Sequence, residues 1–67
     1  MKLFEIRLLE EAVLLEEKIN KLESFFETDM FAKISETQQS LLDDQFEAMV
    51  DYLDCLNARL KDLGIER

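Results

Sequence analysis

The chain has 67 residues, of which 16 are acidic and 8 basic, and its formal net charge is −8. A chain this short has room for one domain, residues 1–67. Such small domains usually need disulfide bonds, bound metals or partner subunits to be stable. One cysteine and no histidine exclude an internal disulfide and a zinc site of soft ligands, which leaves self-association. The negative charge argues against long DNA or RNA as a partner.

The composition is typical of long helices. Proline is absent and Gly64 is the only glycine, whereas a β-rich fold would need several turns built from such residues. No stretch approaches the roughly 18 consecutive apolar residues of a membrane span, and the N-terminus lacks the pattern of a signal peptide. We therefore expect an all-α protein of a reducing cytoplasm, without a membrane as partner.

The first helix is predicted over about residues 2–26. Its apolar residues form two rows at alternating spacings of four and three, which is the pattern of a seam against one partner helix. The two rows are Leu8, Leu15 and Leu22, and Ala12, Ile19 and Phe26.

The start of this helix is too apolar for a single seam. Nine of the thirteen residues from Leu3 to Leu15 are apolar, and a second helix can cover only one stripe of them. An unusually apolar solvent-exposed surface is the alternative. We expect instead an oligomer interface, with a dimer or tetramer forming a helical bundle. The residues predicted for it are Leu3, Phe4, Ile6, Leu9, Val13 and Leu14.

The connection is predicted over residues 27–35 and the second helix over about 36–63. Thr28 is suited to cap a single helical turn, from which Met30, Phe31 and Ile34 are expected to fold back onto the closed end. Ser35 begins a capping box for the second helix, and Gly64 suits the left-handed position that ends it. Its stripe is Leu42, Phe46, Met49, Leu53, Leu56, Leu60 and Leu63, with Cys55 expected in the core as a soft packing residue.

Matched helix lengths and a short connection predict an antiparallel, coiled-coil-like hairpin. In this arrangement Arg7 comes level with residues 57–59, and Tyr52 lies about two turns away from Arg59. Two arginines from different helices with a nearby tyrosine are suited to hold a phosphate and stack a base. Acidic residues at the same end leave ordinary surface ion pairs as the alternative.

Lys18 faces the level of Gln45, nearer the closed half. Polar residues so close to a seam either fix the register or belong to a site shared between subunits.

Acidic residues follow the second helix without a basic residue between Ile34 and Ala58. They favour a solvated outer face, with a metal site or nucleic-acid mimicry as alternatives. The members are Asp43, Asp44, Glu47, Asp51 and Asp54. Because no histidine is present and nothing near Cys55 would activate its thiol, we expect neither an enzyme nor a cofactor.

Taken together, these residues resemble a family of small helical-hairpin proteins of tailed phages and prophages, related to crAss-like phages. The informative positions are Arg7, Lys18, Gln45, Tyr52 and Arg59, because the remaining matches are largely coiled-coil hydrophobics. The matching pattern comprises Glu11, Leu14, Lys18, Ile19, Lys21, Leu22, Phe25, Phe31, Gln39, Leu41, Leu42, Gln45, Met49, Tyr52, Leu56 and Arg59.

The resemblance implies a phage accessory protein acting in the cytoplasm of the infected bacterium. We predict a non-enzymatic anti-defence protein that sequesters a small anionic nucleotide signal between subunits, through Arg7, Lys18, Gln45, Tyr52 and Arg59. One alternative is a module that binds a host protein through its acidic face or apolar N-terminal patch. Another is a purely structural oligomerisation element.

Overall fold

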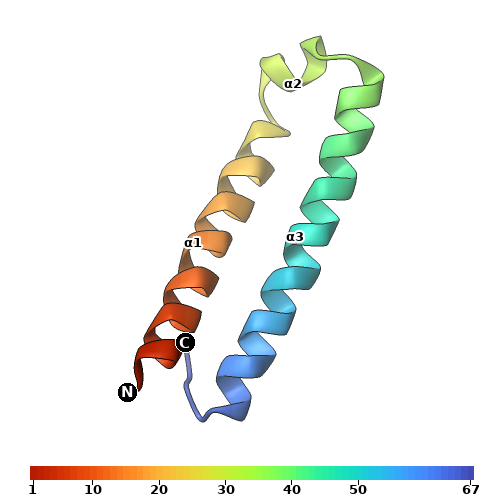
Figure 1. Ribbon diagram of the computed structural model, residues 1–67. Coiled ribbons are helices and arrows are strands. Elements are labelled where there is room, and N and C mark those ends of the chain that lie inside the picture. Colours follow the sequence, from red (N-terminus) through yellow and green to blue (C-terminus); the bar gives the residue numbers. More distant parts are fainter.

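The computed structural model describes residues 1–67 and contains three helices: α1 over Leu3–Phe25, α2 over Asp29–Lys33 and α3 over Glu36–Asp62. The two long helices, α1 and α3, run side by side in opposite directions, with α2 across one end and both termini near the other (Figure 1). The hairpin measures 45 × 16 × 15 Å. The chain is therefore all-α, with its two long helices packed together as the hydrophobic spacing predicts.

The core lies along the seam and is small. It consists of four residues of α1 and two of α3: Leu8, Ala12, Leu15, Ile19, Leu56 and Leu60. Each of these belongs to a predicted row, so the prediction of the seam was correct at its centre. It was wrong at one end, because Leu63 is the C-terminal cap of α3 and 38% exposed.

Aromatic side chains close the end near α2. The rings of Phe26 and Phe31 pack edge to face with their centroids 5.0 Å apart. Phe26 packs against Phe46 in the same way, with a centroid distance of 5.5 Å. Such edge-to-face pairs stabilise beyond the area they bury. Met30 was predicted to join this plug, but it is exposed and does not.

Side chains cap the connection and the start of α3. The Thr28 Oγ1 accepts a hydrogen bond from the Phe31 N–H, and the Ser35 Oγ accepts one from the Gln38 N–H. Both satisfy donors that a helix start leaves unpaired.

The C-terminal end of α3 is a Schellman motif. Gly64 has a φ of +76°, and the Ile65 N–H donates to the Leu60 carbonyl at 2.9 Å. This geometry returns Ile65 onto the core, as the position of the glycine predicts. It also directs the last residues back along the hairpin.

Large apolar side chains remain on the surface of the chain. Besides the first turns of α1, they include Met30, Leu41 and Tyr52. No helix in the structure is both long enough and apolar enough to span a membrane.

Candidate ligand-binding site

An open hollow between α1 and α3 brings together three of the predicted ligand residues. Arg7 and Lys18 come from α1 and Tyr52 from α3, and the Tyr52 hydroxyl donates a hydrogen bond to the Glu11 carboxylate. The hollow is open to solvent and has a volume of about 360 Å³. Its full lining is Arg7, Glu10, Glu11, Leu14, Leu15, Lys18 and Tyr52.

Helical spacing places these residues on one face of the hairpin. On α1, Arg7, Leu14 and Lys18 recur at spacings of seven and four, so they project on the same side as Glu11. Tyr52 is 47% exposed, with its hydroxyl held across the seam by Glu11. We call the side of the molecule that carries Arg7, Glu11, Leu14, Lys18 and Tyr52 the tyrosine face.

Electrostatically the hollow is mixed. Arg7 and Lys18 supply two positive charges, and Glu10 and Glu11 supply two negative charges. A ligand that fits it must therefore offer both an anionic group for the basic residues and hydrogen-bond donors for the carboxylates.

Arg59 and Gln45 lie on the tyrosine face but outside this hollow. Each is seven residues from Tyr52, which is two helical turns, so the three residues share one side of α3. Arg59 lines a second hollow with Phe4, Ala58, Asp62 and Leu63. The Gln45 amide contacts the Met49 sulfur at 3.9 Å. Within one chain, Arg7 and Arg59 therefore line different hollows.

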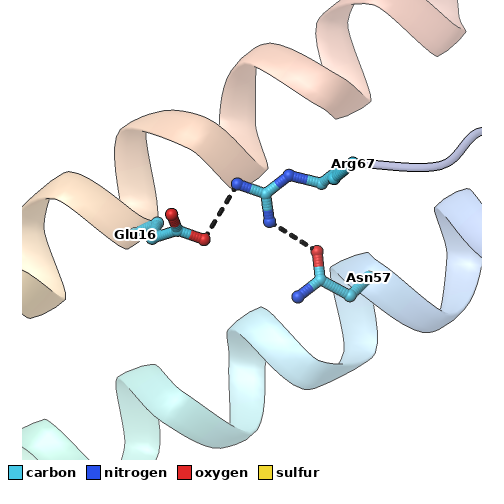
Figure 2. Close-up of polar contacts among 3 residues, drawn as sticks. All are labelled: Glu16, Asn57 and Arg67. Carbon is cyan, nitrogen blue, oxygen red and sulfur yellow. Dashed lines mark hydrogen bonds and ion pairs between the residues drawn. The ribbon is translucent and has the colours of Figure 1, made fainter.

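Arg67 forms a clamp that sequence reasoning missed. Its guanidinium donates to the Glu16 carboxylate of α1 at 2.9 Å and to the Asn57 side-chain oxygen of α3 at 2.7 Å (Figure 2). Asn57 and Arg59 are about 200° apart around α3, so the clamp lies opposite the tyrosine face. The C-terminal residues thus bridge α1 and α3 on that side, beside an open hollow of about 590 Å³. Its lining is Glu16, Asn57, Leu60, Lys61, Ile65, Glu66 and Arg67.

The predicted interface residues are mostly on the surface. Leu3, Phe4 and Leu14 are each more than half exposed, and Ile6 and Val13 are about 40% exposed. Leu9 differs, because it is partly buried against the core. Cys55, predicted to be a core residue, is exposed, since it turns away from the seam that Leu56 fills.

The acidic residues of α3 remain on the surface. Asp43, Asp44, Glu47, Asp51 and Asp54 are all exposed. No three acidic or thiol side chains gather in an arrangement suited to a metal ion. The one ion pair of the fold is Arg67–Glu16, so the acidic side chains have no basic partner within the chain.

The fold and the site together define a small helical-hairpin protein with open, charged hollows along its two long helices. The chain belongs to the Sequestin family, whose sequence model matches residues 2–62. It is 38% identical over 60 residues to an uncharacterized 7.5 kDa protein from the denB–rIIB intergenic region of Enterobacteria phage T4. That similarity covers 90% of this chain and 94% of the phage protein. No solved structure matches the chain.

These findings confirm the general part of the resemblance, a family of small phage proteins. They contain nothing specific to crAss-like phages. The family match ends at residue 62, so the Arg67 clamp lies beyond the matched residues.

Proposed function

We propose that this protein is a non-enzymatic phage accessory protein that sequesters a small anionic nucleotide signal of host defence. Its binding site is the tyrosine face, completed at an interface between subunits in the cytoplasm of the infected bacterium. The name of the family agrees with sequestration in a general way, and its T4 relative agrees with a phage origin.

The hollow formed by Arg7, Lys18 and Tyr52 is the observation that carries this proposal. An arginine and a lysine are suited to phosphate oxygens, and an exposed tyrosine ring is suited to stack on a base. The carboxylates of Glu10 and Glu11 accept hydrogen bonds from ribose hydroxyls or from the amino group of a base. A nucleotide has phosphate oxygens, a base and ribose hydroxyls, whereas inorganic phosphate has only phosphate oxygens.

The experiment compares two lysines of α1. Lys18→Ala removes a charge from the hollow, and Lys21→Ala removes the same charge from an exposed site outside it. We expect Lys18→Ala to weaken retention of nucleotides from extracts of defence-active cells at least tenfold, while Lys21→Ala retains them like the wild type. Arg59→Ala is expected to abolish retention without dissociating the oligomer.

Mass spectrometry of the retained nucleotides gives the readout. Equal retention by the two lysine variants would show that the hollow is not the site. Catalysis would appear as conversion of the nucleotide during incubation, and we expect it to be recovered intact.

Binding of a host protein is the second candidate, and the unpaired acidic side of α3 favours it. Acidic residues without intramolecular partners are available to a basic surface of another protein. Replacing Asp43, Asp44, Glu47 and Asp51 with the corresponding amides should abolish such binding and leave nucleotide retention unchanged. A purely structural oligomerisation element would retain neither kind of partner.

A further inference from the structure

Residues 63–67, which we call the strap, lie against the hairpin on the side opposite the tyrosine face. Ile65 packs on the core, and the Arg67 side chain is only 20% exposed. Figure 2 shows the Arg67 guanidinium reaching the Glu16 carboxylate of α1 and the Asn57 side-chain oxygen of α3. The strap thus seats an aliphatic side chain and, two residues further, a guanidinium on the two long helices.

The helices build the place that holds the guanidinium. Glu16 and Asn57 present two acceptors from different helices, 2.9 Å and 2.7 Å from the Arg67 nitrogens. A guanidinium has a planar fork of donors that engages two acceptors at once, whereas the ammonium group of lysine is a point charge. This place therefore favours arginine over lysine.

Few contacts hold the strap itself. Its last backbone hydrogen bond runs from the Ile65 N–H to the Leu60 carbonyl, and the backbone of residues 66 and 67 makes none. The Glu16 side chain is 49% exposed, and ion pairs so open to water contribute little to stability. The strap also lines the hollow of about 590 Å³ that opens beside it. A segment held in this way can leave without unfolding the helices beneath it.

The groove beneath the strap continues along α3. Val50 is seven residues from Asn57, so both lie on one side of the helix. Phe46 and Val50 pack against the core and line an open hollow of about 240 Å³. The other residues of its lining are Glu47 and Asp51, and neither forms an ion pair within the chain. This side of the hairpin thus combines an apolar floor with unpaired negative charges.

From the seated strap and this charge complementarity we propose that the groove docks an extended, basic segment of another protein, and that the strap occupies the groove when this partner is absent. The docked segment places an aliphatic residue where Ile65 lies and an arginine two residues further, where Arg67 lies. The strap is then an autoinhibitory contact, because the partner must displace it.

The direction of the strap predicts a second basic residue in the partner. The strap runs from the end of α3 back toward Asn57, and Val50 lies about 10 Å further in that direction. About three extended residues span this distance. A lysine or arginine about three positions after the first arginine therefore meets Glu47 and Asp51.

The proposed groove goes beyond nucleotide sequestration and does not rest on it, because it lies opposite the tyrosine face. It gives the binding of a host protein a defined site and a defined chemistry. Charge also decides the class of partner, since unpaired carboxylates repel nucleic acid and attract a basic protein segment.

Peptide binding to the full chain tests the groove. The probe is a fluorescent peptide with the sequence of residues 63–67 followed by Ala-Ala-Lys, and the control peptide has citrulline in place of arginine. In Ile65→Ala/Arg67→Ala the strap no longer competes, so by fluorescence anisotropy we expect binding about tenfold tighter than to the wild type. The citrulline peptide should bind this variant about tenfold more weakly, because it lacks the charge.

A further pair of variants tests the place of the arginine. Added to Ile65→Ala/Arg67→Ala, Glu16→Gln should weaken peptide binding about tenfold, since the guanidinium loses a charged acceptor. Glu17→Gln removes the same charge from the neighbouring exposed position and should leave binding unchanged. Equal binding by these two variants would overturn the proposal. Equal binding by the wild type and Ile65→Ala/Arg67→Ala would overturn it as well.

Circular dichroism of each variant separates loss of docking from loss of the fold. If Ile65→Ala unfolds the chain, Arg67→Ala alone keeps the apolar contact and should still bind the peptide more tightly than the wild type. Absence of peptide binding by a folded variant would overturn the docking site. Peptide binding without nucleotide retention would contradict the proposed function alone, and nucleotide retention without peptide binding would contradict the docking site alone.

Discussion

At the scale of single residues, a few side chains fix features that hydrophobic spacing does not encode. Glu5 caps the start of α1 by accepting a hydrogen bond from the Lys2 backbone N–H at 2.8 Å, and Gln39 donates to the carbonyls of Phe31 and Ile34. These contacts involve backbone groups that helix ends and connections leave unpaired. They escaped sequence reasoning because glutamate and glutamine are equally common on solvated helix surfaces.

Gly64 is the residue where backbone conformation matters most. Its φ of +76° is left-handed, and a Cβ added there would meet no atom within 4 Å. Gly64→Ala should therefore destabilise the protein through conformation alone, by roughly 1 kcal/mol. Gly64→Asn should cost less, because asparagine tolerates this region. Urea denaturation measures both effects. Equal stability of the Gly64→Ala variant and the wild type would contradict the assignment of the Schellman motif.

At the scale of the helices, the sequence predicted the hairpin because its seam repeats at a constant spacing. The same spacing gave a wrong prediction where the helix ends. Leu63 continues the stripe in the sequence, but α3 ends at Asp62 and the chain turns at Gly64. Cys55 was predicted in the core from its residue type, but its position beside Leu56 turns it away from the seam. Met30 belongs to α2, a five-residue helix whose orientation no periodicity defines.

Two leucines of the predicted stripe should therefore respond differently to truncation. Leu56 is 2% exposed and Leu63 is 38% exposed. Leu56→Ala should lower the free energy of unfolding by about 2–5 kcal/mol, a large fraction of the stability of so small a domain. Leu63→Ala should cost about 1 kcal/mol or less. Thermal unfolding compares them, and a similar cost for both would contradict the observed extent of the core.

At the scale of the whole molecule, the chain leaves much of its apolar surface exposed. Its core holds six residues, while Phe4, Leu14 and Tyr52 are each about half exposed. The sequence could predict that Arg7, Lys18 and Tyr52 share a face, because helical spacing defines faces. It could not predict that Arg59 lines a different hollow or that Arg67 bridges Glu16 and Asn57, since both depend on how the chain ends pack.

Native mass spectrometry tests the central claim most directly, on protein purified from bacteria with active nucleotide-signalling defences. The account predicts an oligomer of the 7.9 kDa chain that carries a small-molecule mass, released as an intact nucleotide and absent from the Lys18→Ala variant. A clean oligomer without this mass would contradict sequestration of a nucleotide and favour a host-protein partner. A monomer would contradict the interface, and with it the site that the interface completes.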